Sequence, residues 1–161
     1  MILICYDGSA DSQAAIAGAG EIFGGEPATG LCVWEPFIEV LTRTGFGVAM
    51  YAPDTTDLAE IDAGNERAAR ERAEEGATRA GHAGLKAESQ TRARDGTIAD
   101  AILDEAEAID ARAIVIGTRG LTGLRHMFLG SVSHGVLQEA DRPVIVVPSA
   151  EAAAARAARR R

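Results

Sequence analysis

Residues 2–9 read Ile-Leu-Ile-Cys-Tyr-Asp-Gly-Ser, an apolar run that ends at a turn signal. A short apolar run bounded in this way is typical of a parallel strand buried on both faces. Ser9 is a favourable N-cap, and one face of the helix predicted after it is lined by Ser12, Ile16, Ala19 and Phe23. The chain is therefore predicted to open with a strand and a helix, and the glycines at 24 and 25 end that helix.

Four further stretches predict strands. Three of them are apolar throughout, and they lie at 31–34, 113–116 and 144–147. Residues 85–94 instead alternate between small side chains and charged or polar ones. That alternation is typical of a half-exposed strand, so we expect it at an edge of the sheet.

Helical stretches separate these strands. They are expected over 57–83, over 133–140, and over the segment in which one face holds Ile98, Ile102, Ala106 and Ile109. Residues 35–56 show no steady period, which indicates a long connection over the strand ends and a candidate lid. The order of elements predicts a single-domain α/β fold with an open parallel sheet and helices on both faces. Ligands bind such sheets at the carboxyl ends of the strands.

Composition limits the partners and the setting of the protein. The 161 residues carry a formal net charge of −8, and an acidic surface is expected to repel duplex nucleic acid. No apolar stretch approaches the roughly 18 residues of a membrane span, and the N-terminus lacks the features of a secretory signal. Cys5 and Cys32 lie in apolar runs, which favours buried, reduced thiols and a cytoplasmic location. The basic Ala/Arg-rich tail over 149–161 is expected to be a solvated end.

Two loops at predicted strand ends carry the residues best suited to hold a ligand. Asp7 follows the first strand, where a carboxylate can accept hydrogen bonds from a ribose diol. Its alternative role is to start the turn and to favour the N-terminus of the following helix. The second loop contains Gly117, Gly120 and Gly130. These glycines are expected to adopt positive φ and to let the backbone approach a phosphate.

A helix is predicted shortly after Gly130, so its first amides and its positive dipole end would attract an anion. Ser131 and Ser133 add hydroxyl donors, whereas Arg119 and Arg125 fit solvated loop side chains as well as phosphate ligands. Neither a Walker-type loop nor Gly-x-Gly-x-x-Gly is present. No metal-ligand cluster is evident in the sequence. A nucleophilic triad is equally hard to assemble, because no partner is apparent for His82, His126 or His134.

With these motifs the sequence resembles the universal stress protein family over nearly its whole length. The resemblance rests on the strand that ends in Asp7-Gly8-Ser9, on Gly117-x2-Gly120-x9-Gly130-Ser131, and on Pro143-Val-Ile-Val-Val-Pro148. The glycine spacing is that of the ATP-binding branch of the family. The resemblance implies a domain over 1–148 with a Rossmann-like, five-stranded parallel sheet of order 3-2-1-4-5, of the adenine nucleotide alpha hydrolase type.

The resemblance also implies roles for individual residues. Asp7 would hold the ribose and the backbone near Val33 would meet the adenine. Further nucleotide contacts would come from Tyr6, Ile116, Gly117, Arg119 and Gly120. The phosphates would be held by Gly130, Ser131, Val132 and Ser133. Tyr6 departs from the family pattern, in which a small aliphatic residue is common before the Asp. Members are typically homodimers, often paired through the last strand, here Val144–Val147.

Three functional hypotheses follow. The first is a nucleotide-dependent regulator of the stress response that binds ATP, with Asp7 able to share a Mg²⁺ ion with the polyphosphate. The second is a slow ATPase or nucleotide transferase that uses the same pocket. The third is a dimeric scaffold whose pocket prefers cyclic AMP or holds nothing. The sequence favours the regulator, because it supplies phosphate donors but no convincing base.

Overall fold

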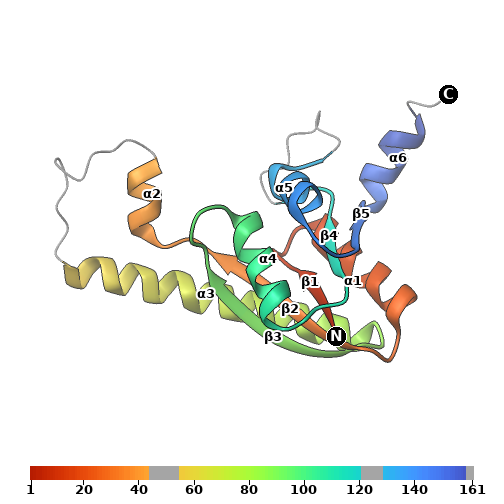
Figure 1. Ribbon diagram of the computed structural model, residues 1–161, viewed down its shortest axis with the longest axis horizontal. Coiled ribbons are helices and arrows are strands. Elements are labelled where there is room, and N and C mark those ends of the chain that lie inside the picture. Colours follow the sequence, from red (N-terminus) through yellow and green to blue (C-terminus); the bar gives the residue numbers. More distant parts are fainter. Residues whose placement is uncertain (44–54, 121–128, 159–161) are drawn as a thin grey trace.

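The computed structural model describes residues 1–43, 55–120 and 129–158, and it contains one five-stranded sheet. Its strands, in chain order, are β1 Ile2–Cys5, β2 Pro27–Trp34, β3 Lys86–Ala93, β4 Ile114–Gly117 and β5 Val144–Val147. All the strand pairs are parallel, and the order across the sheet is β3-β2-β1-β4-β5 (Figure 1). The predicted fold is thus confirmed, including the position of residues 85–94 at an edge.

Helices cover both faces of this sheet. In chain order they are α1 Ala10–Phe23, α2 Phe37–Arg43, α3 Thr55–His82, α4 Ile98–Ala108, α5 Ser131–Glu139 and α6 Ala150–Ala158. Figure 1 shows α1 and α3 on one side of the sheet and α4 and α5 on the other, whereas α6 points away from the body. Because all the strands are parallel, their carboxyl ends lie at the same edge of the sheet, where the loops that follow them can meet.

The central strand explains why the chain folds around its first residues. Ile2, Leu3 and Ile4 have no exposed surface, and alternate side chains enter two separate cores. Ile2 and Ile4 pack under α1 and α3, whereas Leu3 packs under α4 and α5. This two-sided burial is the reason that the strand is apolar at every position, as parallel strands require.

Side-chain caps mark the starts of α1, α4 and α6. The hydroxyl of Ser9 accepts a hydrogen bond from the Ser12 amide at 3.2 Å and starts α1. Thr97 and Asp100 form a reciprocal capping box at the start of α4. The Ser149 hydroxyl accepts from the Ala152 amide in the first turn of α6. Each of these helices thus satisfies one or more of its free N-terminal amides with its own side chains.

The segment after β2 differs from the prediction. Residues 37–43 form the helix α2 rather than part of an irregular connection. Tertiary contacts hold it: the Phe37 amide donates to the Asp62 carboxylate of α3 at 2.6 Å, and Arg94 forms ion pairs of 2.9 Å with Glu35 and Glu39. Such contacts between distant residues leave no local sequence period. The proposed lid over 35–56 otherwise falls mostly on residues 44–54, which lie outside the described part of the chain.

Three boundaries also differ. β2 begins four residues earlier than the apolar run, because Gly30 and its small neighbours allow α3 to pack closely on the strand: a Cβ at Gly30 would lie 3.3 Å from the Ala77 nitrogen. α5 begins at Ser131, two residues earlier than predicted. The tail is helical over Ala150–Ala158 and is anchored at its start, where Ser149 and Ala152 are buried.

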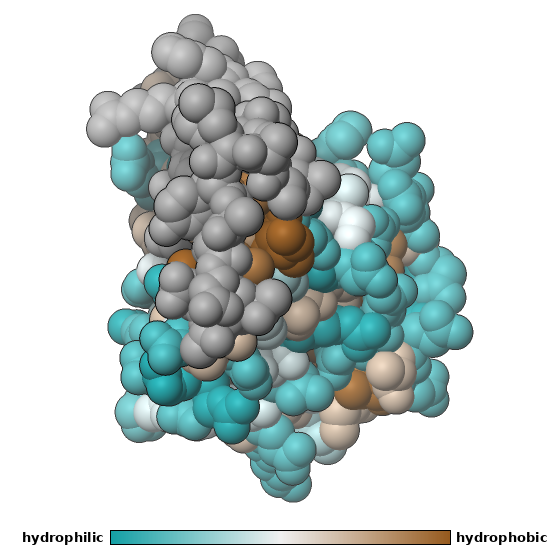
Figure 2. Space-filling model, turned by 90° about the vertical axis from the view of Figure 1, so that its left-hand side faces the viewer, coloured by the Kyte–Doolittle hydropathy of each residue, from teal (hydrophilic) through white to brown (hydrophobic). Residues whose placement is uncertain are grey.

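α3 is long and polar, and it extends beyond the sheet toward α2 (Figure 1). Figure 2 shows this face of the molecule, on which the described residues are mostly hydrophilic and the hydrophobic ones gather in small areas. Exposed large hydrophobic residues of α2 and α3 are Ile38 and Ile61. Within the described parts of the chain, no helix is both long and apolar enough to cross a membrane.

Candidate functional site

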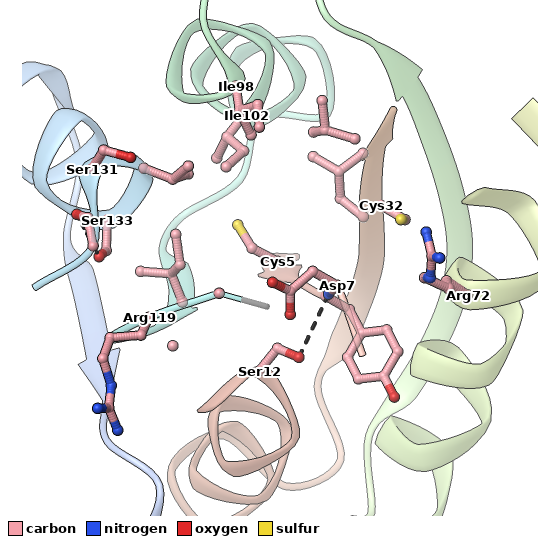
Figure 3. Close-up of a pocket in the computed structure, with 18 residues that line it drawn as sticks. Cys5, Asp7, Ser12, Cys32, Arg72, Ile98, Ile102, Arg119, Ser131 and Ser133 are labelled. Carbon is pink, nitrogen blue, oxygen red and sulfur yellow. Dashed lines mark hydrogen bonds between the residues drawn. The ribbon is translucent and has the colours of Figure 1, made fainter. Parts of the chain in front are cut away.

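A pocket of about 560 Å³ opens at the carboxyl ends of β1, β2 and β4 (Figure 3). Eighteen residues line it, drawn from three strands, from the loops after β1 and β4, and from the helices α1, α3, α4 and α5. The pocket brings together the eleven residues expected to contact the nucleotide, which are Tyr6, Asp7, Val33, Ile116, Gly117, Arg119, Gly120, Gly130, Ser131, Val132 and Ser133. Arg125, weighed together with Arg119 as a phosphate ligand, lies outside the described residues.

Asp7 occupies the centre of this pocket in Figure 3, between the α5 side and the β2 side. Its Oδ1 accepts a hydrogen bond from the Ser9 amide at 2.9 Å, so the carboxylate does help to form the turn. The second oxygen faces Gly120, where an added Cβ would lie only 2.7 Å from Asp7 Oδ2. Gly120 is therefore needed to leave space for the carboxylate in the pocket.

The N-terminus of α5 differs from the capped helices. Gly130 is its N-cap residue and offers no side-chain hydrogen bond, and no acidic residue lies in the first turn. The Gly130 amide donates to the Thr118 carbonyl at 2.7 Å, which ties the two ends of the loop together. The amides of Ser131, Val132 and Ser133 follow at the pocket wall. Free amides at the positive end of a helix dipole attract an anion.

The two serines of this turn are not equivalent. Ser133 is buried, and its hydroxyl donates to the carbonyls of Thr118 and Gly130 at 3.0 and 3.1 Å. Its hydroxyl proton is thus used within the protein, and only its amide remains for a ligand. Ser131 is exposed at the pocket, so it keeps the hydroxyl donor that the sequence assigned to both residues.

The expected positive φ of the loop glycines is wrong. Among the described glycines, positive φ occurs only in turns elsewhere, and Gly130 has φ −72°. A Cβ at Gly130 would sit at ordinary contact distance, 3.4 Å from the Thr118 carbonyl oxygen. Gly117 is required for another reason, since its Cβ would lie 2.6 Å from the backbone of Asp11 in α1. These glycines serve close approach rather than unusual backbone geometry.

A buried network fixes the start of the loop after β4. Asp11 is 5% exposed, and its Oδ2 accepts hydrogen bonds from the Thr118 hydroxyl and from Arg119 Nε, the latter at 3.3 Å. Burial acts to raise the pKa of Asp11, but hydrogen bonds from Ser149, Thr118 and Arg119 outweigh it and hold the pKa below its usual value. Arg119 is thereby anchored by an ion pair at the rim of the pocket.

The β2 side of the pocket is apolar, and most of it was missed in the sequence. Its wall includes Leu31 and Val33 of β2 and Ile98 and Ile102 of α4. Ile98 and Ile102 were assigned correctly to one helical face. The first turn of α4 lies over the carboxyl ends of the strands, so Ile98 and Ile102 contribute both to the core and to the pocket. The helical period predicts the face but not which turn lies beyond the sheet.

Tyr6 is buried beneath this wall, at 2% exposure. Its ring packs on Gly76 of α3, where a Cβ would come within 2.9 Å of the ring carbons. The large residue at position 6 is thus accommodated by a glycine on the facing helix. Burial raises the pKa of Tyr6, and the nearby Glu75 adds to the shift. The hydroxyl lies near Glu75 and Arg79 without a well-formed hydrogen bond to either of these residues.

Among the described residues, the remaining cysteine and histidine side chains do not form a catalytic cluster. Cys32 is buried as expected, while Cys5 is only half-buried and lines the pocket. Burial, helped by the Asp7 carboxylate, raises the pKa of Cys5 to about 12, so the thiol stays protonated. His82 and His134 are exposed and outside the pocket lining, and His126 lies outside the described residues. The described residues contain no group of three or more side chains suited to a metal ion.

Comparisons with known proteins agree with this architecture. The chain is 42% identical over 60 residues to universal stress protein YxiE of Bacillus subtilis, covering 37% of this chain and 40% of that protein. It thus spans about two fifths of that relative's length. The solved structure of protein MJ0577 aligns with a TM-score of 0.71 at 22% identity, over 91% and 94% of the two chains.

The universal stress protein of Archaeoglobus fulgidus in complex with dAMP aligns with a TM-score of 0.58 at 23% identity, over 91% of this chain and 95% of that one. At such identities these structures support the fold alone. The sequence model of the universal stress protein family matches residues 1–148. This match covers nearly the whole chain, and the chain therefore belongs to the universal stress protein family.

Proposed function

We propose that this protein binds ATP in the pocket at the carboxyl ends of β1, β2 and β4, and that the bound nucleotide regulates its contacts in a cytoplasmic stress response. The observation that carries the proposal is the chemical division of the pocket. One side is apolar, the centre holds a carboxylate, and the other side presents the uncapped N-terminus of α5. These three environments suit a base, a ribose and a polyphosphate, in that order.

Each part of the nucleotide has proposed contacts. The adenine would lie against Val33, Leu31 and Ile102, with backbone groups at the end of β2 reading its edge. Asp7 would accept hydrogen bonds from the ribose hydroxyls through the oxygen that does not bond Ser9. The phosphates would lie at the amides of 131–133 and at the Ser131 hydroxyl. Asp7 could also contribute one oxygen ligand to a Mg²⁺ ion carried by the polyphosphate.

Similar proteins support an adenine nucleotide as the ligand. Related structures have been solved with dAMP, with cAMP and, for a protein of Arabidopsis thaliana, with AMP. Three successive amides and the Ser131 hydroxyl at the start of α5 would suit the phosphates of ATP. The Gly117-x2-Gly120-x9-Gly130-Ser131 spacing supports the same choice.

A regulator is favoured over an enzyme by what the described pocket residues offer. The Cys5 thiol is protonated, and Arg119 is held by Asp11 at the pocket rim. The two described histidines lie outside the lining. Amides that bind the ground state do not by themselves accelerate phosphoryl transfer, which also needs a positioned nucleophile. We therefore expect ATP turnover well below the ordinary enzyme range of roughly 1 to 1000 per second.

We also propose a homodimer paired through β5. This strand lies at the edge of the sheet, with β4 on one side, and all four of its residues are partly exposed. An unpaired edge of consecutive Val and Ile residues is prone to uncontrolled pairing, and a two-fold partner would cover it. Light scattering at tens of micromolar protein should give the mass of two chains.

Titration calorimetry tests the binding proposal. ATP, with and without Mg²⁺, is titrated into purified protein from which copurified nucleotide has been removed, with GTP as the comparison. We expect saturable binding of ATP with one site per chain, and weaker binding of GTP. Absence of heat and of competition at millimolar ATP would refute the proposal. A steady-state phosphate-release assay on the same sample separates the regulator from an enzyme.

A further inference from the structure

The pocket reaches both faces of the sheet. Its apolar wall of Leu31, Ile102 and Ile116 belongs to the core under α4 and α5. Tyr6 and Cys32 also line the pocket, yet they pack in the cores under α1 and α3. The pocket therefore has a second region on the α3 side of the strand ends. We call this region the α3 recess, and define it by Tyr6, Cys32 and Arg72.

Arg72 is a different kind of pocket residue from Arg119. Arg119 is 20% exposed and is held by Asp11 at 3.3 Å. Arg72 is exposed on α3 and lines the recess, and no carboxylate of the described residues forms an ion pair with it within 4 Å. Most arginines of the described residues, such as Arg70 and Arg79 on the same helix, form an ion pair with a carboxylate. Glu75 of α3 lies within electrostatic range of Arg72 without forming such an ion pair. In a protein of net charge −8, Arg72 is thus a pocket cation that no described carboxylate holds at close range.

The location of Arg72 defines which part of a ligand it can reach. Figure 3 shows Ser131, Ser133 and Arg119 on one side of Asp7, and Cys32 and Arg72 on the opposite side. Burial is the main cause that raises the pKa of Cys32. The thiol also senses both charges, because Arg72 acts to lower this pKa and Asp7 acts to raise it. The guanidinium and the carboxylate thus lie within electrostatic range of one thiol. If the hydroxyls of a ribose bind Asp7, its 2′ and 3′ oxygens lie at the centre of the pocket, and Arg72 lies on the side away from α5.

We propose that Arg72 is a specificity-determining residue that binds a phosphate ester on the 2′ or 3′ oxygen of the nucleotide. The inference rests on the proposed binding of an adenine nucleotide at Asp7 and α5. Arginine suits this task because its guanidinium donates two parallel hydrogen bonds to phosphate oxygens. The favoured ligand then carries anionic groups at both ends of the ribose, one at the α5 amides and one at Arg72. A positive group in the recess also offsets repulsion between that phosphate and Asp7.

Calorimetry with three nucleotides tests the inference. AMP, adenosine 3′,5′-bisphosphate and adenosine 2′,5′-bisphosphate are titrated into the wild type, Arg72→Gln and Arg67→Gln. Arg67 is the matched control, since it is an exposed arginine of α3 outside the pocket lining. At least one bisphosphate should bind the wild type and Arg67→Gln roughly tenfold more tightly than AMP. In Arg72→Gln this preference should disappear, while the affinity for AMP changes little.

The outcomes separate this inference from the proposed function. If AMP binds but neither bisphosphate binds more tightly, the role of Arg72 is refuted and the nucleotide site stands. A preference that persists in Arg72→Gln, or that is lost equally in Arg67→Gln, also refutes it. If none of the three nucleotides nor ATP binds, both proposals fail.

Discussion

The two sides of the pocket are built in opposite ways. On the α5 side, the lining comes from three glycines and the first turn of α5, whose amides have no side-chain cap. On the β2 side, the wall consists of aliphatic side chains from two strands and α4. A side built of amides tolerates changes of neighbouring side chains but not an added bulky group. On a side built of side chains, the ligand affinity depends on the size of each side chain. Substitutions on the two sides are therefore expected to have different effects.

Gly130→Val should have the largest effect on binding. Gly130 has ordinary φ, and a Cβ meets its neighbours no closer than 3.4 Å, so the fold should tolerate the change. The branched side chain would, however, occupy the space in front of the α5 amides. We expect ATP affinity to fall at least about a hundredfold, or about 2.7 kcal/mol. Calorimetry measures the affinity, and thermal unfolding measures the stability.

Gly64→Val is the matched control for this substitution. Gly64 lies in α3, and a Cβ there meets nothing within 4 Å. Its ATP affinity should equal that of the wild type. If Gly130→Val also binds like the wild type, the phosphates do not lie at α5. If Gly130→Val fails to fold, Gly130→Ala takes its place. This variant should lower the affinity for ATP more than the affinity for adenosine.

Asp11→Asn probes the anchoring of the α5 side rather than its ligand contacts. The carboxylate is buried and accepts from Thr118 and Arg119, so its loss should cost about 2 kcal/mol of unfolding free energy at pH 7. Because the folded pKa is lowered, the stabilisation is present above the unfolded pKa of about 3.8 and is lost as pH falls through the folded value.

Denaturant unfolding at several pH values checks this expectation. The stability difference between wild type and Asp11→Asn should be constant from neutral pH down to about pH 4 and should shrink below it. A difference that grows on acidification contradicts the assignment. Thr118→Val removes one donor to the same carboxylate and should give a smaller loss with the same pH trend.

Asp7→Ala tests the centre, where the two sides meet. The wild type should bind ATP more tightly than 2′,3′-dideoxy-ATP, because the carboxylate accepts from the ribose hydroxyls. Two such hydrogen bonds to a charged group in partial contact with water correspond to about tenfold in affinity. In Asp7→Ala the two nucleotides should bind alike. If the ratio of the two affinities is the same in the variant as in the wild type, the ribose does not bind Asp7. The carboxylate would then serve only to form the turn with Ser9.

The smallest effect is expected at Cys5, on the β2 side. With its pKa near 12, the thiol should react with iodoacetamide at pH 8 far more slowly than a free cysteine. Saturating ATP should slow the reaction further, because the adenine would cover the wall. Mass spectrometry of the Cys32→Ala variant, in which Cys5 is the single cysteine, measures the rate of labelling. Rapid labelling, or labelling that ATP does not affect, would contradict the account of this side.

The same contrast explains what the sequence could predict. The α5 side depends on spacing along one loop and on the helix that follows it, so Gly130 and its successors were recognisable as a group. The β2 side depends on which turn of α4 overhangs the sheet and on the recess under α3, where Arg72 lies. Those positions follow from tertiary packing. The strands of the fold were predictable because each is apolar or alternating, whereas α2 was not, because Asp62 and Arg94 hold it from distant elements.

Amide chemical shifts measured during an ATP titration test the central claim most directly. The claim is that one nucleotide binds with its phosphates at α5 and its base at the end of β2. We predict the largest changes at the amides of Ser131, Val132 and Ser133, substantial changes at Val33 and Asp7, and little change along α6. The changes at α5 should be much smaller with adenosine, while those at Val33 should persist. Largest shifts in α6 or at β3, or none at saturating ATP, would contradict the account.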